Sequence, residues 1–583
     1  MGLWCSKQTD DSTLERYFSE FRHHVIGHDT VIPTPSTGPR KMIYADWTAS
    51  GRSYAPIEKK MVSLLELVAN THSEGNTTAR IMTQAYHESI EIIKRHVHAN
   101  DDDVLIAYGS GMTAAINKFQ RILGLKWPVK DYVTISEYMR PVVFVTHQEH
   151  HSNQTSWGET IATVVVVPPN SEGMVSVDNF KIALMDFKNR KYKFASISAC
   201  SNVSGICTPY HEIAALMHSC GGFCFVDFAT SFGYVDIFMH NKATKANDKL
   251  DAIFFSPHKL LGGPGSAGIA VFDRKLYSYS CPDCVGGGIV KWTNPWGEKS
   301  YVDDIEARED SGTPGFLQLI RVALAIRLKE QMGVNNIRKR ESVLNAIVFR
   351  ELEKIPNLKI VEGQCKERLS IFSFMVDGLH YNLCMKLLND RFGIQTRAGC
   401  SCAGTLAHHV FKVSKETSAA MTSKIERGDY STKPGWVRVS LHPTMSNQEV
   451  LFICDSIREV VQSHSLWSRE YSVNSLTNEY THLNDSGEWF QDKLTNLFSF
   501  GNQILTKRVQ NPFDNDVDDD NDSKDFTMQS SSGNTCFSIC SLSASLTEEP
   551  DKPFLVSFLG LTQPGPGTPL GRLLSRQESR SGP

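Results

Sequence analysis

The segment Ala252-Ile253-Phe254-Phe255-Ser256-Pro257-His258-Lys259 joins an apolar run of strand length to a serine, a histidine and a lysine. Similar apolar runs, separated by intervals of helix length, occupy residues 104–107, 142–146, 194–197, 223–226 and 268–272. Strands that alternate with helices in this way form a mostly parallel sheet that is covered on both faces. The sequence therefore predicts an α/β fold.

Residues that bear chemistry follow five of these runs, where the strands are expected to end. They are the glycine turn Gly109-Ser110-Gly111, then His150, Asn202, Asp227 and Lys259. Ligands of open parallel sheets bind at this edge, and a glycine turn that leads into a helix suits a phosphate. A buried lysine loses its proton readily, and a neutral amine forms a Schiff base with an aldehyde. With an aspartate to pair with a pyridinium nitrogen, the set meets the requirements of pyridoxal phosphate.

In these residues the chain resembles the class V aminotransferase family of fold-type-I pyridoxal-phosphate enzymes, within its cysteine desulfurase and selenocysteine lyase branch. The resemblance covers residues 30–465 and rests on motifs at residues 111–117, 149–153, 201–205, 226–227, 256–259, 312–314 and 397–403. It implies a large domain with a mostly parallel seven-stranded sheet and a smaller C-terminal α/β domain. It also implies a C2 homodimer with shared active sites, in which Gly286-Gly287-Gly288 and Thr313 reach the neighbouring subunit's site.

The resemblance also implies how the cofactor would be held. Lys259 would carry pyridoxal phosphate as an internal aldimine, and Asp227 would keep the pyridine nitrogen protonated. His150 would stack over the ring, Asn202 would contact its phenolic oxygen, and Thr230 stands where the family usually has a glutamine. The residues implied to hold the phosphate are Gly111, Met112, Thr113, Ser256 and His258.

On the substrate side, Arg438 matches the arginine that grips the substrate carboxylate in a bidentate manner, and Ala49 is expected in the same site. Cys402 matches the cysteine that accepts sulfur and becomes a persulfide, and the nearby Arg397 would favour its thiolate. Lys259, His150 and Cys402 are thus the implied catalytic residues. The implied partners are a small amino acid of the cysteine type and a protein that accepts the persulfide.

The sequence leaves alternatives open. Gly399-Cys400-Ser401 precede Cys402, where characterised desulfurases have a stretch that contains histidine. The chain could instead catalyse another class V reaction, as an aminotransferase, an epimerase or a β-eliminating lyase, with Cys402 a bystander. A third hypothesis is a catalytically silent scaffold tethered to a membrane. It is disfavoured because a scaffold has no need for all four of the intact residues Lys259, Asp227, His150 and Arg438.

Changes in composition divide the chain into six segments. Residues 1–13 are a lipidation-competent start, and residues 14–74 are expected to pack on the small domain. Residues 75–330 form the large cofactor-binding domain and residues 331–465 the small one. Residues 466–513 are an unassigned extension, and residues 514–583, which are rich first in Asp, then in Ser, then in Pro and Gly, are predicted to be a disordered tail.

The overall composition excludes several classes of protein. The 583 residues carry a formal charge of −4, which argues against a protein that binds nucleic acid. The longest apolar runs have the length of strands, so no membrane-spanning helix is expected. Fourteen cysteines without a secretory signal indicate reduced thiols and a cytoplasmic protein. The pair Cys281 and Cys284 lacks further ligands at suitable spacing, so no metal site is predicted.

The N-terminal sequence Met-Gly-Leu-Trp-Cys-Ser suggests a different route to a membrane. Gly2, exposed after removal of Met1, and Ser6 match the pattern for N-myristoylation. One myristoyl chain anchors a protein only marginally, and Cys5 is a candidate for palmitoylation as the second signal. The sequence therefore allows peripheral membrane attachment.

Overall fold

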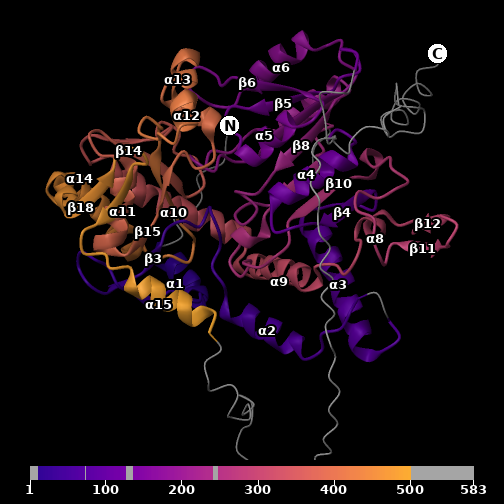
Figure 1. The fold of residues 1–583 in the computed structure, drawn as a ribbon, viewed down its shortest axis with the longest axis horizontal. Helices are drawn as coiled ribbons and strands as arrows, with labels where there is room; N and C mark the ends of the chain where they lie inside the picture. Colours follow the sequence, from indigo (N-terminus) through magenta and orange to yellow (C-terminus); the bar gives the residue numbers. More distant parts are fainter. Residues whose placement is uncertain (1–10, 72–73, 127–134, 241–246, 500–583) are drawn as a thin grey trace, which may run out of the picture. The chain divides into compact units, whose positions relative to one another are not determined.

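The computed structural model describes residues 11–71, 74–126, 135–240 and 247–499 (Figure 1). Residues up to Asp485 belong to one compact unit, and α15 (Glu488–Leu497) belongs to a second. Gly2, Cys5 and the tail predicted from residue 514 lie outside the described residues. In the described part of the chain, no helix combines the length and the apolar character needed to cross a membrane.

A seven-stranded sheet forms the centre of the large domain, with the strand order β4-β10-β9-β8-β7-β5-β6. Its strands are β4 (Asp103–Ala107), β5 (Val142–Thr146), β6 (Thr163–Val167), β7 (Lys193–Ser198), β8 (Phe223–Asp227), β9 (Ala252–Phe255) and β10 (Ile269–Asp273). β10 runs antiparallel to both of its neighbours, and every other pairing in the sheet is parallel. The predicted, mostly parallel seven-stranded sheet is confirmed.

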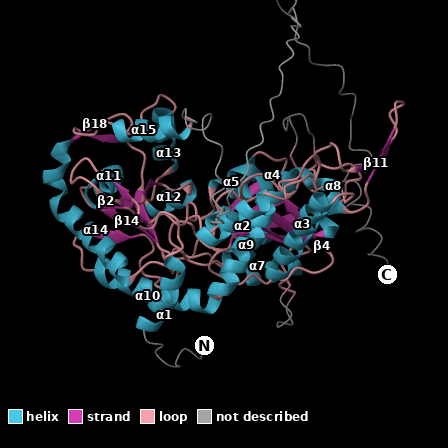
Figure 2. Cartoon of the chain, turned by 90° about the horizontal axis from the view of Figure 1, so that it is seen from below, coloured by secondary structure: helices cyan, strands magenta, loops and turns pink. Residues whose placement is uncertain are grey.

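Both faces of this sheet are covered by helices because its strands are apolar on both sides. Leu105 packs in the cluster that contains Ile93, whereas its neighbours Val104 and Ile106 pack in the cluster that contains Phe119. The helices on the first face are α3 (Thr77–His96), α6 (Val177–Asp186), α7 (Tyr210–Ser219) and α9 (Phe316–Met332). α4 (Met112–Ile122) and α5 (His151–Gly158) cover the other face, and Figure 2 shows α4 and α5 opposite α7 and α9.

A glycine separates the large domain from the small one. α9 ends at Met332, and α10 (Val334–Leu352) begins two residues later. Gly333 between them has a φ of 74°, in the left-handed region that glycine adopts at little cost. The chain therefore changes direction at this point, close to the predicted boundary at residue 331.

The small domain is built on a four-stranded antiparallel sheet with the order β13-β14-β17-β16. Its strands are β13 (Leu358–Ile360), β14 (Ile371–Val376), β16 (Arg397–Gly399) and β17 (Trp436–Ser440), and its main helices are α10, α11 (Tyr381–Phe392) and α14 (Asn447–Trp467). α14 begins with a capping box in which the Ser446 and Glu449 side chains each bond the other's backbone N–H. This domain appears in orange tones in Figure 1.

The N-terminal segment contacts both domains. α1 (Asp11–Arg22) packs against α10, and β3 (Ile43–Tyr44) pairs in parallel with β15 (Ile394–Gln395) of the small domain. α2 (Ala55–Leu65), however, packs against α9 of the large domain. The remaining elements are β1 (Val31–Ile32), β2 (Arg40–Lys41), β11 (Val290–Thr293), β12 (Lys299–Tyr301), α8 (Ile305–Glu309), α12 (Gly404–Val410), α13 (Lys415–Ile425), β18 (Tyr471–Asn474) and β19 (Glu479–His482).

Candidate active site

A cavity of about 510 Å³ lies at the carboxyl ends of the parallel strands, where residues of the small domain close it. All ten predicted cofactor-binding residues line this cavity. Its lining includes Ala49, Gly111, Met112, Thr113, His150, Asn202, Asp227, Thr230, Ser256, His258, Lys259 and Arg438. The cavity therefore brings together residues that lie up to 390 positions apart, from Thr48 to Arg438.

The first turn of α4 forms an anion cradle within this cavity. The Met112 N–H donates to Ser256 Oγ at 2.8 Å, and the Thr113 and Ser152 hydroxyl oxygens lie 2.6 Å apart. A Cβ atom added to Gly111 would lie 3.2 Å from Ser256 Oγ and 3.6 Å from the His258 ring, so glycine keeps the cradle open. Backbone N–H groups and the positive end of a helix dipole favour a phosphate at such a place.

Lys259 and Asp227 are oppositely charged groups placed in the same desolvated pocket. Asp227 ends β8, and burial raises its pKa to about 6 although the Ala229 N–H donates to Oδ1 at 2.8 Å. Lys259 lies in a short 3-10 turn, Pro257–Lys259, directly after β9, and burial lowers its pKa to about 8. Desolvation thus disfavours both charges, which leaves an amine that is partly neutral near physiological pH.

His150 caps the N-terminus of α5 with its ring. Nδ1 accepts from the Ser152 N–H at 3.1 Å, so in the neutral ring the proton lies on Nε2. The preceding residue, Glu149, is fully buried and its oxygens accept five hydrogen bonds, from the N–H and hydroxyl groups of Thr146 and Ser198 and from the Asn153 amide. This carboxylate joins the ends of β5 and β7 to α5 and so fixes where His150 lies.

Asn202 links the large domain to the small one. Its Nδ2 donates to the Ser401 carbonyl at 2.7 Å, and its own carbonyl accepts from Arg438 Nη1 at 3.0 Å. Its Oδ1 is buried and has no hydrogen-bond partner among the described residues. Thr230 lies on the same cavity wall. A buried polar atom without a partner requires a ligand or water to satisfy it.

Arg438, on β17, is only 2% exposed and is held by two contacts. Nη2 pairs with Asp46 Oδ1 at 2.7 Å, and Nη1 donates to Asn202. Nε is buried and lacks a partner in the part of the chain that the structure describes. The guanidinium is therefore fixed in position and keeps donor capacity for an incoming anion.

Cys402 lies beside His150 and Arg397 in a loop of the small domain. Arg397 Nη2 lies 3.5 Å from Cys402 Sγ. A hydrogen bond with His150 lowers the pKa of the Cys402 thiol, and the charges of Arg397 and Arg438 lower it further. The thiol is half-buried, and its environment favours the thiolate, the form that acts as a nucleophile.

Some predicted residues are not part of this cavity. Cys402 itself does not line the cavity, although its neighbours Ser401 and Arg397 do. Neither Thr313 nor Gly286-Gly287-Gly288 lines it within the chain, and the Thr313 hydroxyl instead accepts from Asn70 Nδ2 at 3.3 Å. Among the described residues there is no group of three or more side chains that could hold a metal ion. The contribution of Thr313 and Gly286-Gly287-Gly288 to a neighbouring subunit's site stays a prediction.

Sequence reasoning missed three residues that position the site. Asp46 pairs with Arg438, and the buried Glu149 carboxylate joins β5 and β7 to α5. Ser152 joins Thr113 to His150. Two signals existed in the sequence for Glu149, since it directly precedes His150 and follows a strand. The pairing of Asp46 with Arg438 left no local signal because 392 positions separate the two residues.

Comparisons with known proteins identify the family of the chain. The aminotransferase class-V family model matches residues 43–452. A cysteine desulfurase from Synechococcus elongatus is 26% identical over 58% of this chain and 50% of that protein, and one from Cronobacter sakazakii is 31% identical over 45% of this chain and 62% of that protein. The chain therefore spans less than two thirds of the length of these curated relatives. The apo structure of a cysteine desulfurase from Thermococcus onnurineus NA1 matches with a TM-score of 0.58 at 21% identity, over 72% of this chain and 95% of that one, and shows the shared fold.

The fold and the lysine-bearing cavity define a fold-type-I pyridoxal-phosphate enzyme. The chain belongs to the aminotransferase class-V family, because that family's model covers more than half of its length. Its residues fit the cofactor, since the site offers an open anion cradle at Gly111, the unpartnered Asn202 Oδ1 and the buried pair of Lys259 and Asp227.

Proposed function

We propose that this enzyme removes sulfur, or selenium, from a cysteine-type amino acid and receives it on Cys402. The observation that carries the proposal is the contact of Cys402 with both His150 and Arg397 at the edge of the cofactor cavity. The relatives named as cysteine desulfurases support the same reaction. The position that the motif resemblance assigns to the thiol and its lowered pKa together favour a nucleophile over a structural cysteine.

The cofactor would be held by the residues that line the cavity. Lys259 supplies the amine, Asp227 the carboxylate for the pyridine nitrogen, and the first turn of α4 with Ser256 and His258 the phosphate site. When bound, pyridoxal phosphate withdraws electrons from the substrate's α-carbon. The Lys259 amine, with a pKa of about 8, accepts the proton from that carbon and later returns a proton to the product.

Cys402 performs the sulfur step. Its thiolate attacks the substrate's sulfur, the bond between carbon and sulfur breaks, and the electron pair stays on carbon, which gains a proton. Cysteine and the Cys402 thiol thus become alanine and a Cys402 persulfide. Arg438, fixed by Asp46, binds the substrate carboxylate.

A pair of substitutions in one loop tests this proposal. Cys402→Ser should reduce the formation of alanine from cysteine by about a hundredfold or more, because a hydroxyl is a far weaker acceptor of sulfur. Cys400→Ser, two residues away, is the matched control and should retain the rate within a few-fold. Cofactor loading is followed separately by visible absorbance. Lys259→Ala should abolish this absorbance, because the variant has no lysine amine at this position to bind the cofactor's aldehyde.

Full activity of Cys402→Ser would contradict the proposal. Product analysis would then favour the second hypothesis, another class V reaction in which Cys402 is a bystander. Absence of turnover in the wild type as well as in Cys400→Ser and Cys402→Ser, with normal cofactor absorbance, would instead point to the silent scaffold.

Assembly and location are further parts of the proposal. We propose a homodimer in which Gly286-Gly287-Gly288 and Thr313 approach the partner's site, and a separate protein that accepts the persulfide. We also propose that Gly2 and Cys5 carry lipids that attach this otherwise cytoplasmic enzyme to a membrane.

A further inference from the structure

Cys200 and Cys207 face each other across the turn that follows β7. They form an antiparallel bridge. The hydrogen bonds on either side of it join the Thr208 N–H to the Ala199 carbonyl at 2.9 Å and the Ser201 N–H to the Ile206 carbonyl at 3.0 Å. The two cysteines therefore occupy a non-hydrogen-bonded pair position, where Cα atoms are about 4.5 Å apart and side chains are closest.

This position suits a disulfide. A disulfide requires Cα atoms at about 4.4–6.8 Å, a range that includes the spacing of a non-hydrogen-bonded pair. The Cys200 thiol donates to the Ser201 carbonyl at 3.6 Å, and the neighbouring Cys200 side chain lowers the pKa of the Cys207 thiol. Cys200 is 1% exposed, whereas Cys207 is exposed at the surface. The Cys207 thiol is thus accessible to a small oxidant. The Cys200 thiol is placed to attack a mixed disulfide formed on Cys207.

The turn between the two cysteines reaches the cofactor cavity. Asn202 contacts Ser401 and Arg438, as described above. The Val203 carbonyl accepts from the Ser373 hydroxyl at 2.7 Å, and the Gly205 carbonyl accepts from the Leu369 N–H at 2.8 Å. The turn therefore connects the Cys402 loop, the substrate arginine and the first residues of β14.

We propose that Cys200 and Cys207 are a reversible dithiol–disulfide site that controls the position of Asn202. A low-molecular-weight disulfide such as glutathione disulfide is the oxidant. The Cys207 thiolate attacks one of its sulfur atoms and releases glutathione, and the Cys200 sulfur then attacks the mixed disulfide and releases a second glutathione. The protein loses two hydrogen atoms, the two glutathiones gain them, and two electrons pass to the oxidant.

Oxidation changes the geometry of the turn. The sulfur–sulfur bond, about 2.05 Å long, is shorter than any contact between two thiols, so the Cys200 and Cys207 side chains must rotate toward each other and the turn between them readjusts. A shift of even about 1 Å at a positioning residue can cost about a hundredfold in rate. We expect kcat/KM to fall at least tenfold in the oxidised enzyme. This effect on turnover rests on the proposed desulfuration, whereas the cross-link does not.

The test uses the full-length enzyme loaded with cofactor. It is incubated with excess glutathione disulfide, remaining thiols are alkylated, and cross-links are mapped by mass spectrometry. We expect a disulfide between Cys200 and Cys207 in the wild type and in Cys220→Ser, a control at an exposed cysteine near the same sheet, but none in Cys207→Ser. Oxidation should lower turnover in the first two proteins, and dithiothreitol should restore it, while Cys207→Ser should keep more of its activity.

Each of the following results would overturn part of the proposal. Glutathione retained on Cys207 without a cross-link would show that Cys200 does not resolve the mixed disulfide. A complete cross-link with unchanged turnover would show that the turn does not control Asn202. If the reduced enzyme fails to release sulfur from cysteine at all, the proposed function fails, and the mass map still decides whether the dithiol site exists.

Discussion

At the scale of single residues, Cys402 has a backbone conformation that residues with side chains rarely adopt. Its φ is 59°, and that of Ser401 before it is 53°. Two left-handed residues in succession cost roughly 1–2 kcal/mol each, and contacts from other elements hold them. Asn202 and Trp436 bind Ser401, and the His151 N–H donates to the Cys402 carbonyl at 2.8 Å. The thiol is thus presented by a loop that its neighbours fix.

Arg397→Gln tests the electrostatics of this thiol. Removing the cation 3.5 Å from Sγ should raise the Cys402 pKa toward its ordinary value, which leaves less thiolate at pH 7. We expect alkylation of Cys402 by iodoacetamide at pH 7 to slow by about threefold to tenfold, and the variants' rates to converge above pH 9. Peptide-resolved mass spectrometry measures this rate against the other cysteines.

Arg121→Gln is the matched control for this measurement. Arg121 also lines the cavity, but its guanidinium is paired with Asp283 at 2.8 Å and 2.9 Å. Its removal should leave Cys402 alkylation nearly unchanged. Equal slowing in both variants would mean that Arg397 acts through the general field of the cavity and not through its contact with Sγ.

At the scale of elements, the sequence predicted the residues that stand at strand ends because two local signals coincide there. An apolar run ends, and a residue that is costly to bury follows at once, as with Asp227 after β8. Residues that act through contacts between distant elements lack such signals. Asp46 is such a residue, because its partner Arg438 is known only once the N-terminal segment is placed beside β17. Glu149 follows a strand, but its bond to Ser198 on a second strand is likewise known only from the structure.

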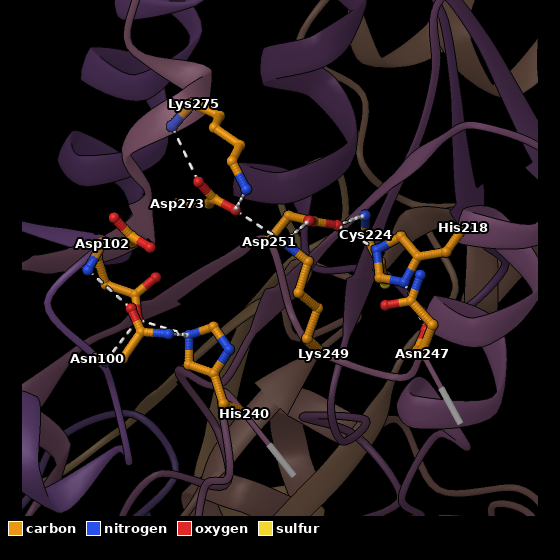
Figure 3. Close-up of polar contacts among 11 residues, drawn as sticks. Asn100, Asp102, His218, Cys224, His240, Asn247, Lys249, Asp251, Asp273 and Lys275 are labelled. Atoms are coloured by element: carbon orange, nitrogen blue, oxygen red, sulfur yellow. Dashed lines mark hydrogen bonds and ion pairs between the residues drawn. The ribbon is translucent and has the colours of Figure 1, made fainter. Parts of the chain in front are cut away.

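The opposite edge of the sheet carries a network whose stability should depend on pH (Figure 3). His218 on α7 lies between the Asn247 carbonyl, 2.6 Å from Nδ1, and Asp251 Oδ2, 2.7 Å from Nε2. Both partners accept, so both ring nitrogens donate and the ring is cationic. Burial opposes this charge, but the Asp251 carboxylate outweighs it and raises the His218 pKa.

Because the folded-state pKa of His218 is raised, the stability that it contributes decreases as pH rises. Stability from His218 is complete below its unfolded pKa of about 6.5 and is lost as pH rises through the higher folded pKa. His218→Gln should therefore cost about 1–2 kcal/mol at pH 6 and clearly less at pH 9, measured as the shift in urea midpoint. His211→Gln on the same helix, where the ring contacts the Asp248 carbonyl, is the control. A cost in His218→Gln that does not vary with pH would exclude a charged ring.

At the scale of the whole molecule, the site is completed by chain segments that lie far apart in the sequence, with 392 positions between Asp46 and Arg438. Residues 45–48 run beside the end of β17, where the Ser440 N–H donates to the Ala45 carbonyl and the Thr48 N–H donates to Ser440 Oγ. Asp46 reaches Arg438 from this segment. The segment of residues 45–48 is therefore a structural component of the active site.

The N-terminal residues themselves are tested by Gly2→Ala. A myristoyl chain needs Gly2, and alone it gives only marginal binding, so Cys5 is expected to add the second anchor. In cells that express N-myristoyltransferase and palmitoyltransferases, the wild type should sediment with membranes and Gly2→Ala should stay in the supernatant. Cys5→Ser should be distributed between the two fractions. Because these positions precede the catalytic body, all three proteins should form alanine from cysteine at the same rate in detergent extracts, and an unchanged membrane fraction in Gly2→Ala would refute lipid attachment.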